Sequence, residues 1–249
     1  MGQTYVKKYE INTIDFDMNR HLRAITIINF LQDISTRHYV SALRENNLKD
    51  EDGFWVIVEW DVIIKQYPDR AQWLSVLTEP IYFRKFIAYR RYEITDESGQ
   101  IIATATSKWA YMSIQKHAQT NIPAYIYEMF GVEASAEKPD RLPKLFMPET
   151  DAYSFTTRVA YSDIDVNGHV NNGAYFHWLM DAIPEVISEA RYPKQIQIHY
   201  RNEMFNGEEV RIKLAKAPKQ EDLQLIGTQY LVSEIENHEK TAVQCVLSW

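Results

Sequence analysis

The chain has 249 residues, enough for one large domain or two small ones, and its 45% hydrophobic and 24% charged content is ordinary for a folded protein. Its formal net charge of −7 argues against nucleic-acid binding, and its single cysteine, Cys245, rules out an internal disulfide or a cysteine metal cluster. The N-terminal stretch resembles neither a secretory signal nor a transit peptide, and no window holds 18 consecutive apolar residues. We therefore expect a cytoplasmic protein without a membrane span.

The first half begins with a polar segment, DFDMNRH at residues 15–21. Apolar residues then recur at helical spacing, which predicts a helix over residues 24–47. Residues 55–67 are typical of a strand, and residues 89–94 and 101–112, joined by TDESGQ, predict an antiparallel hairpin. Residues 131–150 contain three prolines and little periodicity, so they are expected to form a linker.

The second half repeats this order. Aligned without a gap, residues 9–34 and 157–182 share six identities: Asp15, Asp17, Asn19, His21, Leu31 and Asp33 match Asp163, Asp165, Asn167, His169, Leu179 and Asp181. A second helix is expected after the polar segment, then a strand at 195–205 and a hairpin at 228–249.

An internal duplication of this kind predicts an α+β protein of two tandem hotdog domains, each an antiparallel sheet wrapped around a long central helix. The expected boundaries are 1–130 for the first domain, 131–150 for the linker and 151–249 for the second domain. Two copies in one chain can pair as two identical subunits would, and a further homodimer is left open.

The polar strip DIDVNGHVNN at residues 163–172 is the candidate site. If the strip is extended, Asp165, Asn167 and His169 point to one face. Asn171 and Asn172 are placed to cap the following helix, and the helix start at Asn172, Gly173 and Ala174 is a candidate for stabilising an oxyanion. These groups together suit acyl transfer.

Two other interpretations of the strip compete with catalysis. The pattern D-x-D-x-N-G matches the start of a calcium-binding EF-hand loop, but Ala174 stands where the bidentate glutamate belongs. A purely structural role, in which Asp and Asn build turns and caps, explains Asn171 and Asn172 well but explains His169 poorly.

The segments DIDVNGHVNN, WLMDAIPEVI and HYRNEMF resemble the acyl-acyl-carrier-protein thioesterases of plants and bacteria, and TSKWAYM and FWVIVEWDVIIKQYP resemble the first half of that family. The resemblance spans essentially the whole chain. It implies that Asp165, Asn167, His169 and Glu203 are catalytic. Many plant members carry a cysteine after that glutamate; Met204 occupies the matching position here, and a thioether cannot act as that nucleophile, so the resemblance implies no Cys–His mechanism.

Only the second copy is expected to be catalytic. Aligning the turns that follow residues 55–67 and 195–205 places Lys65 opposite Glu203, and Arg23 and Ala24 replace the two helix-capping asparagines. The first half is therefore expected to supply structure and an acyl-chain pocket, with three large residues as candidate walls: Phe30, Trp55 and Trp60.

The implied reaction is hydrolysis of an acyl thioester on acyl carrier protein, which ends fatty acid synthesis and needs no cofactor or metal. The sequence leaves open whether Asp165, His169 or Glu203 is the base or the nucleophile, and which acyl chains are preferred. Because that carrier is acidic, docking requires local basic clusters, and the candidates are Arg84, Lys85, Arg90 and Arg91, and Arg191, Lys194 and Arg201. The alternatives are an acyl-coenzyme A thioesterase and a non-catalytic acyl-binding protein.

Overall fold

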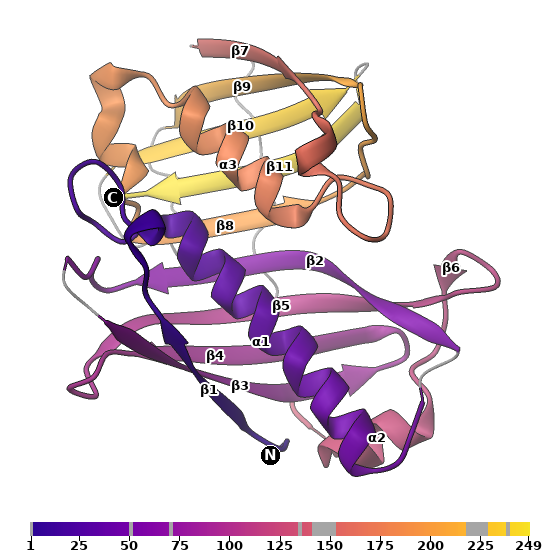
Figure 1. Cartoon of the computed structure of the whole chain (residues 1–249). Helices are drawn as coiled ribbons and strands as arrows, with labels where there is room; N and C mark the ends of the chain where they lie inside the picture. The colour runs from indigo at the N-terminus through magenta and orange to yellow at the C-terminus, as the bar shows by residue number, and fades with distance from the viewer. Residues whose placement is uncertain are drawn as a thin grey trace. The chain divides into compact units, whose positions relative to one another are not determined.

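The computed structural model describes residues 2–49, 52–69, 72–133, 136–140, 153–217, 229–237 and 240–249 (Figure 1). The chain divides into two compact units, Met1–Arg141 and Leu142–Trp249. The predicted linker, residues 131–150, falls largely outside the described residues. No helix in the described ranges is long and apolar enough to cross a membrane.

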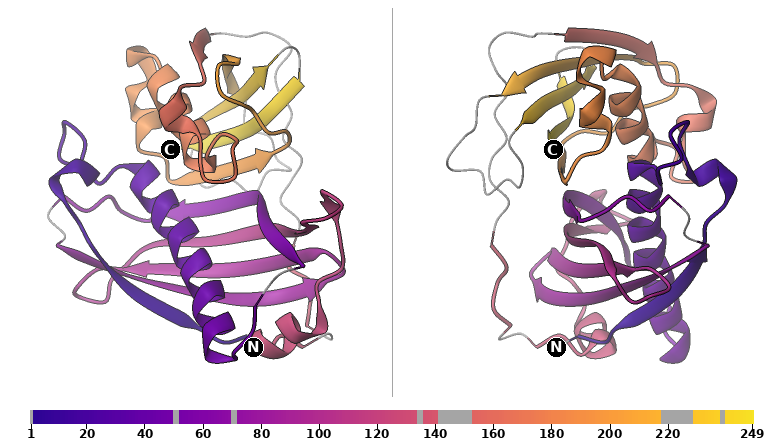
Figure 2. Two further views of the ribbon diagram at one scale, coloured as in Figure 1. Left: turned by 45° about the vertical axis from the view of Figure 1, so that its right-hand side comes forward. Right: turned by 90° about the vertical axis from the view of Figure 1, so that its left-hand side faces the viewer.

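The N-terminal unit is an antiparallel sheet that curves around one long helix (Figures 1 and 2). Its elements are β1 (Tyr5–Glu10), α1 (Ala24–Glu45), β2 (Gly53–Ile64), β3 (Trp73–Arg84), β4 (Ile87–Thr95), β5 (Ile101–Ser113), the short β6 (Ala118–Gln119) and α2 (Ala124–Phe130). The strands pair in the order β1-β3-β4-β5-β2, and β6 pairs with β5. The predicted helical face is confirmed, because Ile27, Ile28, Leu31 and Ile34 are all buried.

The C-terminal unit has the same topology. Its elements are β7 (Tyr153–Arg158), α3 (Asn172–Ala182), a 3-10 segment (Glu185–Arg191), β8 (Gln195–Tyr200), β9 (Glu209–Ala217), β10 (Tyr230–Asn237) and β11 (Lys240–Ser248). All pairs are antiparallel, in the order β7-β9-β10-β11-β8. Each strand therefore has a counterpart in the first unit, and the prediction of two hotdog folds is confirmed.

The second helix is half as long as the first, since α3 has 11 residues where α1 has 22. Pro184 is the cause. A proline disfavours helical backbone in the residue before it, and Ile183 has the extended angles φ −67° and ψ 118°. The chain resumes as a 3-10 segment, which is kinked at Ile187.

Cys245 lies on β11 and is 2% exposed. Burial raises the pKa of its thiol, so the thiolate is disfavoured. In this position Cys245 packs as a small apolar residue.

Candidate active site

The polar strip folds as a tight loop rather than an extended segment, so the expectation that its side chains share one face of a strand is wrong. A bridge between Ile164 and Val170 closes the loop. Inside it, the Asp165 N–H donates to the His169 carbonyl at 3.0 Å, and the Gly168 N–H donates to the Asp165 carbonyl at 3.1 Å. Gly168 has φ +83°, a left-handed conformation that glycine adopts without strain. Asp165 and His169 therefore face each other across the turn.

Asp163 and Asn167 form hydrogen bonds within this loop. The Asp163 carboxylate accepts from the Ala160 N–H at 2.8 Å, which fixes the entry to the loop. Asn167 donates twice to Asp165, from its backbone N–H at 2.8 Å and from its side-chain amide at 3.2 Å. Both oxygens of the Asp165 carboxylate are thereby oriented, and the side chain of Asn167 lies against Asp165.

Glu203 approaches the loop from the chain that follows β8. Its neighbour Met204 is held on both sides, because the Met204 carbonyl accepts from the Val170 N–H at 2.9 Å and the Met204 N–H donates to the Tyr175 hydroxyl at 3.1 Å. Met204 is 1% exposed and anchors the segment in the core. Because Met204 is anchored, the backbone of the adjacent Glu203 is held in place beside the loop.

His169 lies between two carboxylates. Its Nδ1 is 3.9 Å from Asp165 Oδ1, and its Nε2 is 3.8 Å from Glu203 Oε1. The Asp165 and His169 side chains are mostly buried, whereas 56% of the Glu203 side chain is exposed. Three of the four residues predicted to be catalytic thus lie together, and the fourth, Asn167, donates a hydrogen bond to Asp165. A carboxylate–imidazole–carboxylate set can orient and deprotonate a water.

Tyr175, on the buried face of α3, lies beside these residues and is not among the predicted site residues. Its side chain is 3% exposed and holds the Met204 N–H. Burial, with a smaller contribution from the nearby Glu203, raises the pKa of Tyr175, so the phenol stays protonated. Its hydroxyl positions the segment that carries Glu203.

Fewer backbone N–H groups are free at the start of α3 than the sequence analysis expects, because two of the three already donate. Of the two asparagines predicted to cap the helix, Asn171 is the N-cap of α3, and its side chain accepts from the Gly173 N–H at 2.8 Å, whereas Asn172 is the first helical residue. The Ala174 N–H donates to the Asn171 carbonyl at 2.9 Å. Of the three predicted oxyanion donors, only the Asn172 N–H has no partner among the described residues.

The corresponding loop of the first unit has the same backbone. The Asp17 N–H donates to the His21 carbonyl at 2.9 Å, and Arg20, with φ +65°, takes the place of Gly168. A bridge between Phe16 and Leu22 closes the loop as Ile164 and Val170 close the second one.

This correspondence corrects the predicted alignment of Lys65 with Glu203. The Leu22 N–H donates to the carbonyl of Pro68 at 3.0 Å, so Pro68 occupies the position of Met204, and Tyr67 that of Glu203. Lys65 instead matches Arg201, because their N–H groups donate to the equivalent carbonyls of β5 and β11. The first copy still lacks the second carboxylate, as predicted.

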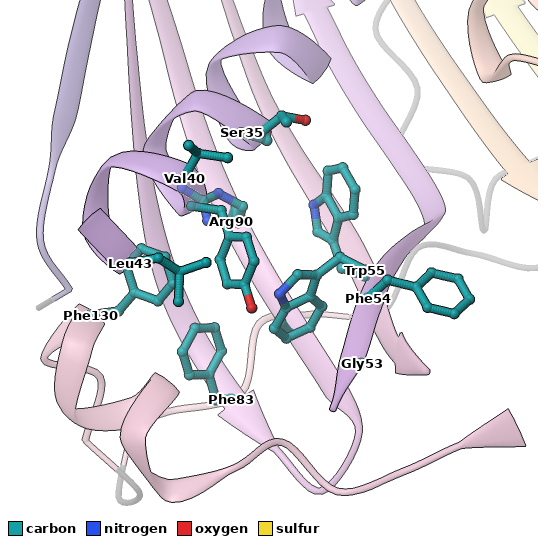
Figure 3. Close-up of a pocket in the computed structure, with 13 residues that line it drawn as sticks. Ser35, Val40, Leu43, Gly53, Phe54, Trp55, Phe83, Arg90 and Phe130 are labelled. Carbon is teal, nitrogen blue, oxygen red and sulfur yellow. The ribbon is translucent and has the colours of Figure 1, made fainter. Parts of the chain in front are cut away.

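A cavity of about 290 Å³, open to solvent on the side of Val40 and Phe54, lies in the N-terminal unit (Figure 3). Its walls are mainly aromatic and aliphatic side chains from α1, β2 to β5 and α2: Tyr39, Val40, Leu43, Phe54, Trp55, Phe83, Ala88, Trp109 and Phe130. Among the predicted walls, Trp55 lines this cavity. Trp60 is fully buried against Tyr92, and Phe30 stacks on Tyr9, so neither lines it.

One residue of the first predicted basic cluster, Arg90, is buried rather than exposed. Arg84, the last residue of β3, and Lys85, in the turn that follows, are exposed, as is Arg91, which pairs with Glu79 at 2.5 Å. Arg90 is only 7% exposed and lines the cavity, so its prediction as a docking residue is wrong. Strand alternation sends adjacent arginines to opposite faces.

In the second cluster, Lys194 and Arg201 are exposed, whereas Arg191 is partly buried and engages the Ile183 carbonyl and Glu185. Across the described ranges, no three His, Cys, Asp or Glu side chains gather in a way that could hold a metal ion.

Two family models together span most of the chain. Residues 2–130 match the acyl-ACP thioesterase N-terminal domain, and residues 148–247 match the acyl-ACP thioesterase C-terminal domain. Similar curated proteins include the chloroplastic acyl-[acyl-carrier-protein] hydrolase FATB2 of Cuphea viscosissima, 26% identical over 81% of this chain and 52% of its own length. Another is the chloroplastic oleoyl-acyl carrier protein thioesterase 2 of Arabidopsis thaliana, 25% identical over 91% of this chain and 67% of its own. The chain spans about half the length of several curated relatives it matches.

Solved structures share the fold over nearly the full chain. The 12:0-ACP thioesterase from Umbellularia californica superposes with a TM-score of 0.82, at 19% identity, covering 99% of this chain and 96% of its own. An acyl-ACP thioesterase from Bacteroides thetaiotaomicron gives a TM-score of 0.77 at 19% identity, covering 98% and 97%.

Proposed function

This chain belongs to the acyl-ACP thioesterase family, and we propose that it hydrolyses the thioester of a fatty acyl group carried on acyl carrier protein, releasing a free fatty acid. The observation that carries the proposal is the position of His169 between Asp165 and Glu203 in the second copy of a duplicated loop. The curated relatives are named for the same hydrolysis.

In the proposed reaction, a water attacks the thioester carbonyl carbon. Asp165 beside Nδ1 favours the His169 tautomer with its proton on that nitrogen, which leaves Nε2 free to accept one. Nε2 and Glu203 Oε1 are 3.8 Å apart, a separation that one water oxygen can bridge by donating to both. Such separations often tighten when substrate binds.

The electron and proton balance is then simple. The water oxygen forms the new C–O bond while its proton passes to His169 Nε2, and the carbonyl oxygen becomes an oxyanion, for which the Asn172 N–H is the remaining candidate donor. The C–S bond breaks as the carbonyl reforms. The leaving thiol has a pKa near 8.5, as a cysteine does, so it departs as thiolate and takes the proton from His169.

The cavity of the N-terminal unit is proposed to bind the acyl chain, since its walls are mostly apolar and its size is at the lower end for ligand pockets. The proposed partner is acyl carrier protein bearing the phosphopantetheine-linked chain. Arg84 and Lys85, and Lys194 and Arg201, are the exposed cations suited to an acidic carrier. A cytoplasmic location remains a prediction.

The test compares hydrolysis of one acyl group on acyl carrier protein and on coenzyme A, scored by kcat/KM. Preference for the carrier protein is expected. Preference for coenzyme A would favour an acyl-coenzyme A thioesterase, and tight acyl binding without turnover would favour a non-catalytic binding protein.

A further inference from the structure

A buried cation interrupts the apolar wall of the cavity. Arg90 on β4 is 7% exposed and borders the cavity (Figure 3). Its Nε donates to Thr78 Oγ1 at 3.2 Å, and its Nη2 donates to His38 Nδ1 at 2.6 Å. These two contacts fix the guanidinium at one place on the wall.

The charge of Arg90 has no anion to balance it among the described residues. No carboxylate there forms an ion pair with it, and the buried Glu79 on the adjacent strand pairs with Arg91. His38 is neutral, because burial and the neighbouring guanidinium lower the pKa of His38 to about 3. The Phe130 ring, 5.5 Å away, supplies only a weakly negative face. Burial without an anion is costly and lowers the pKa of Arg90, but a guanidinium starts from so high a pKa that it stays protonated at neutral pH.

Arg90 also has hydrogen-bond donors to spare. A guanidinium carries five N–H groups. Thr78 and His38 take one each, and the Tyr92 hydroxyl beside the group takes at most one more. At least two N–H groups are left over on a side chain that borders the cavity. A ligand made only of methylene groups would leave them without an acceptor, which costs binding free energy.

We propose that this cavity takes an aliphatic chain carrying an oxygen, and that Arg90 donates hydrogen bonds to that oxygen. The oxygen is a hydroxyl or keto substituent on an acyl chain, or the carboxylate of a free fatty acid. The cavity volume of about 290 Å³ corresponds to roughly ten water-sized groups, which suits a chain of medium length. The inference rests on the proposed function only in taking the cavity as a chain-binding site.

The test uses three ligands of equal length: octan-1-ol, octanoate and 1-fluorooctane, whose fluorine is a poor acceptor. Binding to the full chain is followed by titration calorimetry and by the fluorescence of Trp55 and Trp109, which line the cavity. Binding requires no turnover, so a chain that fails to hydrolyse acyl thioesters can still confirm or overturn this inference.

The wild type is expected to bind an oxygenated ligand at least about tenfold more tightly than 1-fluorooctane, the effect of one hydrogen bond to a charged donor. Octanoate binding most tightly would identify a carboxylate; octan-1-ol binding most tightly would identify a substituted chain. R90M should bind the oxygenated ligands no more tightly than 1-fluorooctane, while its affinity for 1-fluorooctane is retained. R44M, which removes an exposed arginine at the end of α1, should keep the wild-type preference for oxygenated ligands.

Three results would overturn the proposal: equal binding of all three ligands to the wild type, no binding of any of them, or an unchanged preference in R90M. Should R90M fail to fold, R90K keeps the buried charge without the planar fork, and the preference should decrease there as well. An R90K variant with the full wild-type preference would equally refute the role of Arg90.

Discussion

Replacing Glu203 with Gln keeps the size of the side chain and removes its charge beside His169. When the imidazole takes a proton, that charge stabilises it across 3.8 Å. With an effective dielectric constant between about 80 and 20, the interaction is worth about 1 to 4 kcal/mol, or roughly fivefold to 1000-fold in kcat. Because 56% of the side chain is exposed, solvent screens the pair, and we expect a loss of about tenfold to 100-fold.

The assay is steady-state hydrolysis of acyl-carrier-protein thioester by the wild type and E203Q. E209Q, which removes an exposed carboxylate at the start of β9, is the matched control and should retain wild-type kcat. The melting temperature of E203Q should change little, since exposed substitutions usually alter stability by less than about 0.5 kcal/mol. A kcat for E203Q within twofold of the wild type would refute the assignment of Glu203.

Three further predictions concern positioning, stability and docking. Y175F removes the acceptor of the Met204 N–H, so kcat should fall several-fold. Because Tyr175 acts by positioning Glu203, adding E203Q to Y175F should lower kcat by less than E203Q does in the wild type, and additive losses in the double variant would contradict this. His38 has a pKa lowered to about 3, so between pH 6.5 and 3 the unfolded state binds more protons and stability falls as pH falls, by at most about 1.4 kcal/mol per unit. In urea unfolding, H38Q should lack this part of the acid sensitivity, and equal pH profiles would disprove it. R84E with K85E should raise KM for acyl carrier protein and leave kcat unchanged, whereas an unchanged KM would exclude that turn from docking.

The duplication and the two hotdog folds could be predicted because they depend on patterns that survive in side chains: six aligned identities, helical spacing in α1 and strand alternation. The meeting of His169 with Glu203 was reached only through family resemblance. Those residues are far apart in sequence, and neither local periodicity nor spacing brings them together.

The errors have physical causes. The alignment of Lys65 with Glu203 is wrong because the two units are related by hydrogen bonds to backbone carbonyls. Any residue can supply a carbonyl, so the sequence gives no sign that Pro68 and Met204 are equivalent. The sequence predicts Arg90 on the surface because it lies in a run of basic residues and charged side chains are usually solvated. The partner that holds Arg90 inside, His38, lies 52 residues away.

The left-handed residue in each loop has a consequence for how such a chain can change over time. Gly168 adopts φ +83° freely, but Arg20 holds φ +65° at a cost of about 1 to 2 kcal/mol, and its loop keeps the same closing bonds. The loop is therefore retained in a unit that lacks the second carboxylate, which means that its shape serves the scaffold independently of chemistry. A duplicated protein built this way can silence one site, or reopen it, by exchanging a few side chains on a frame that stays intact.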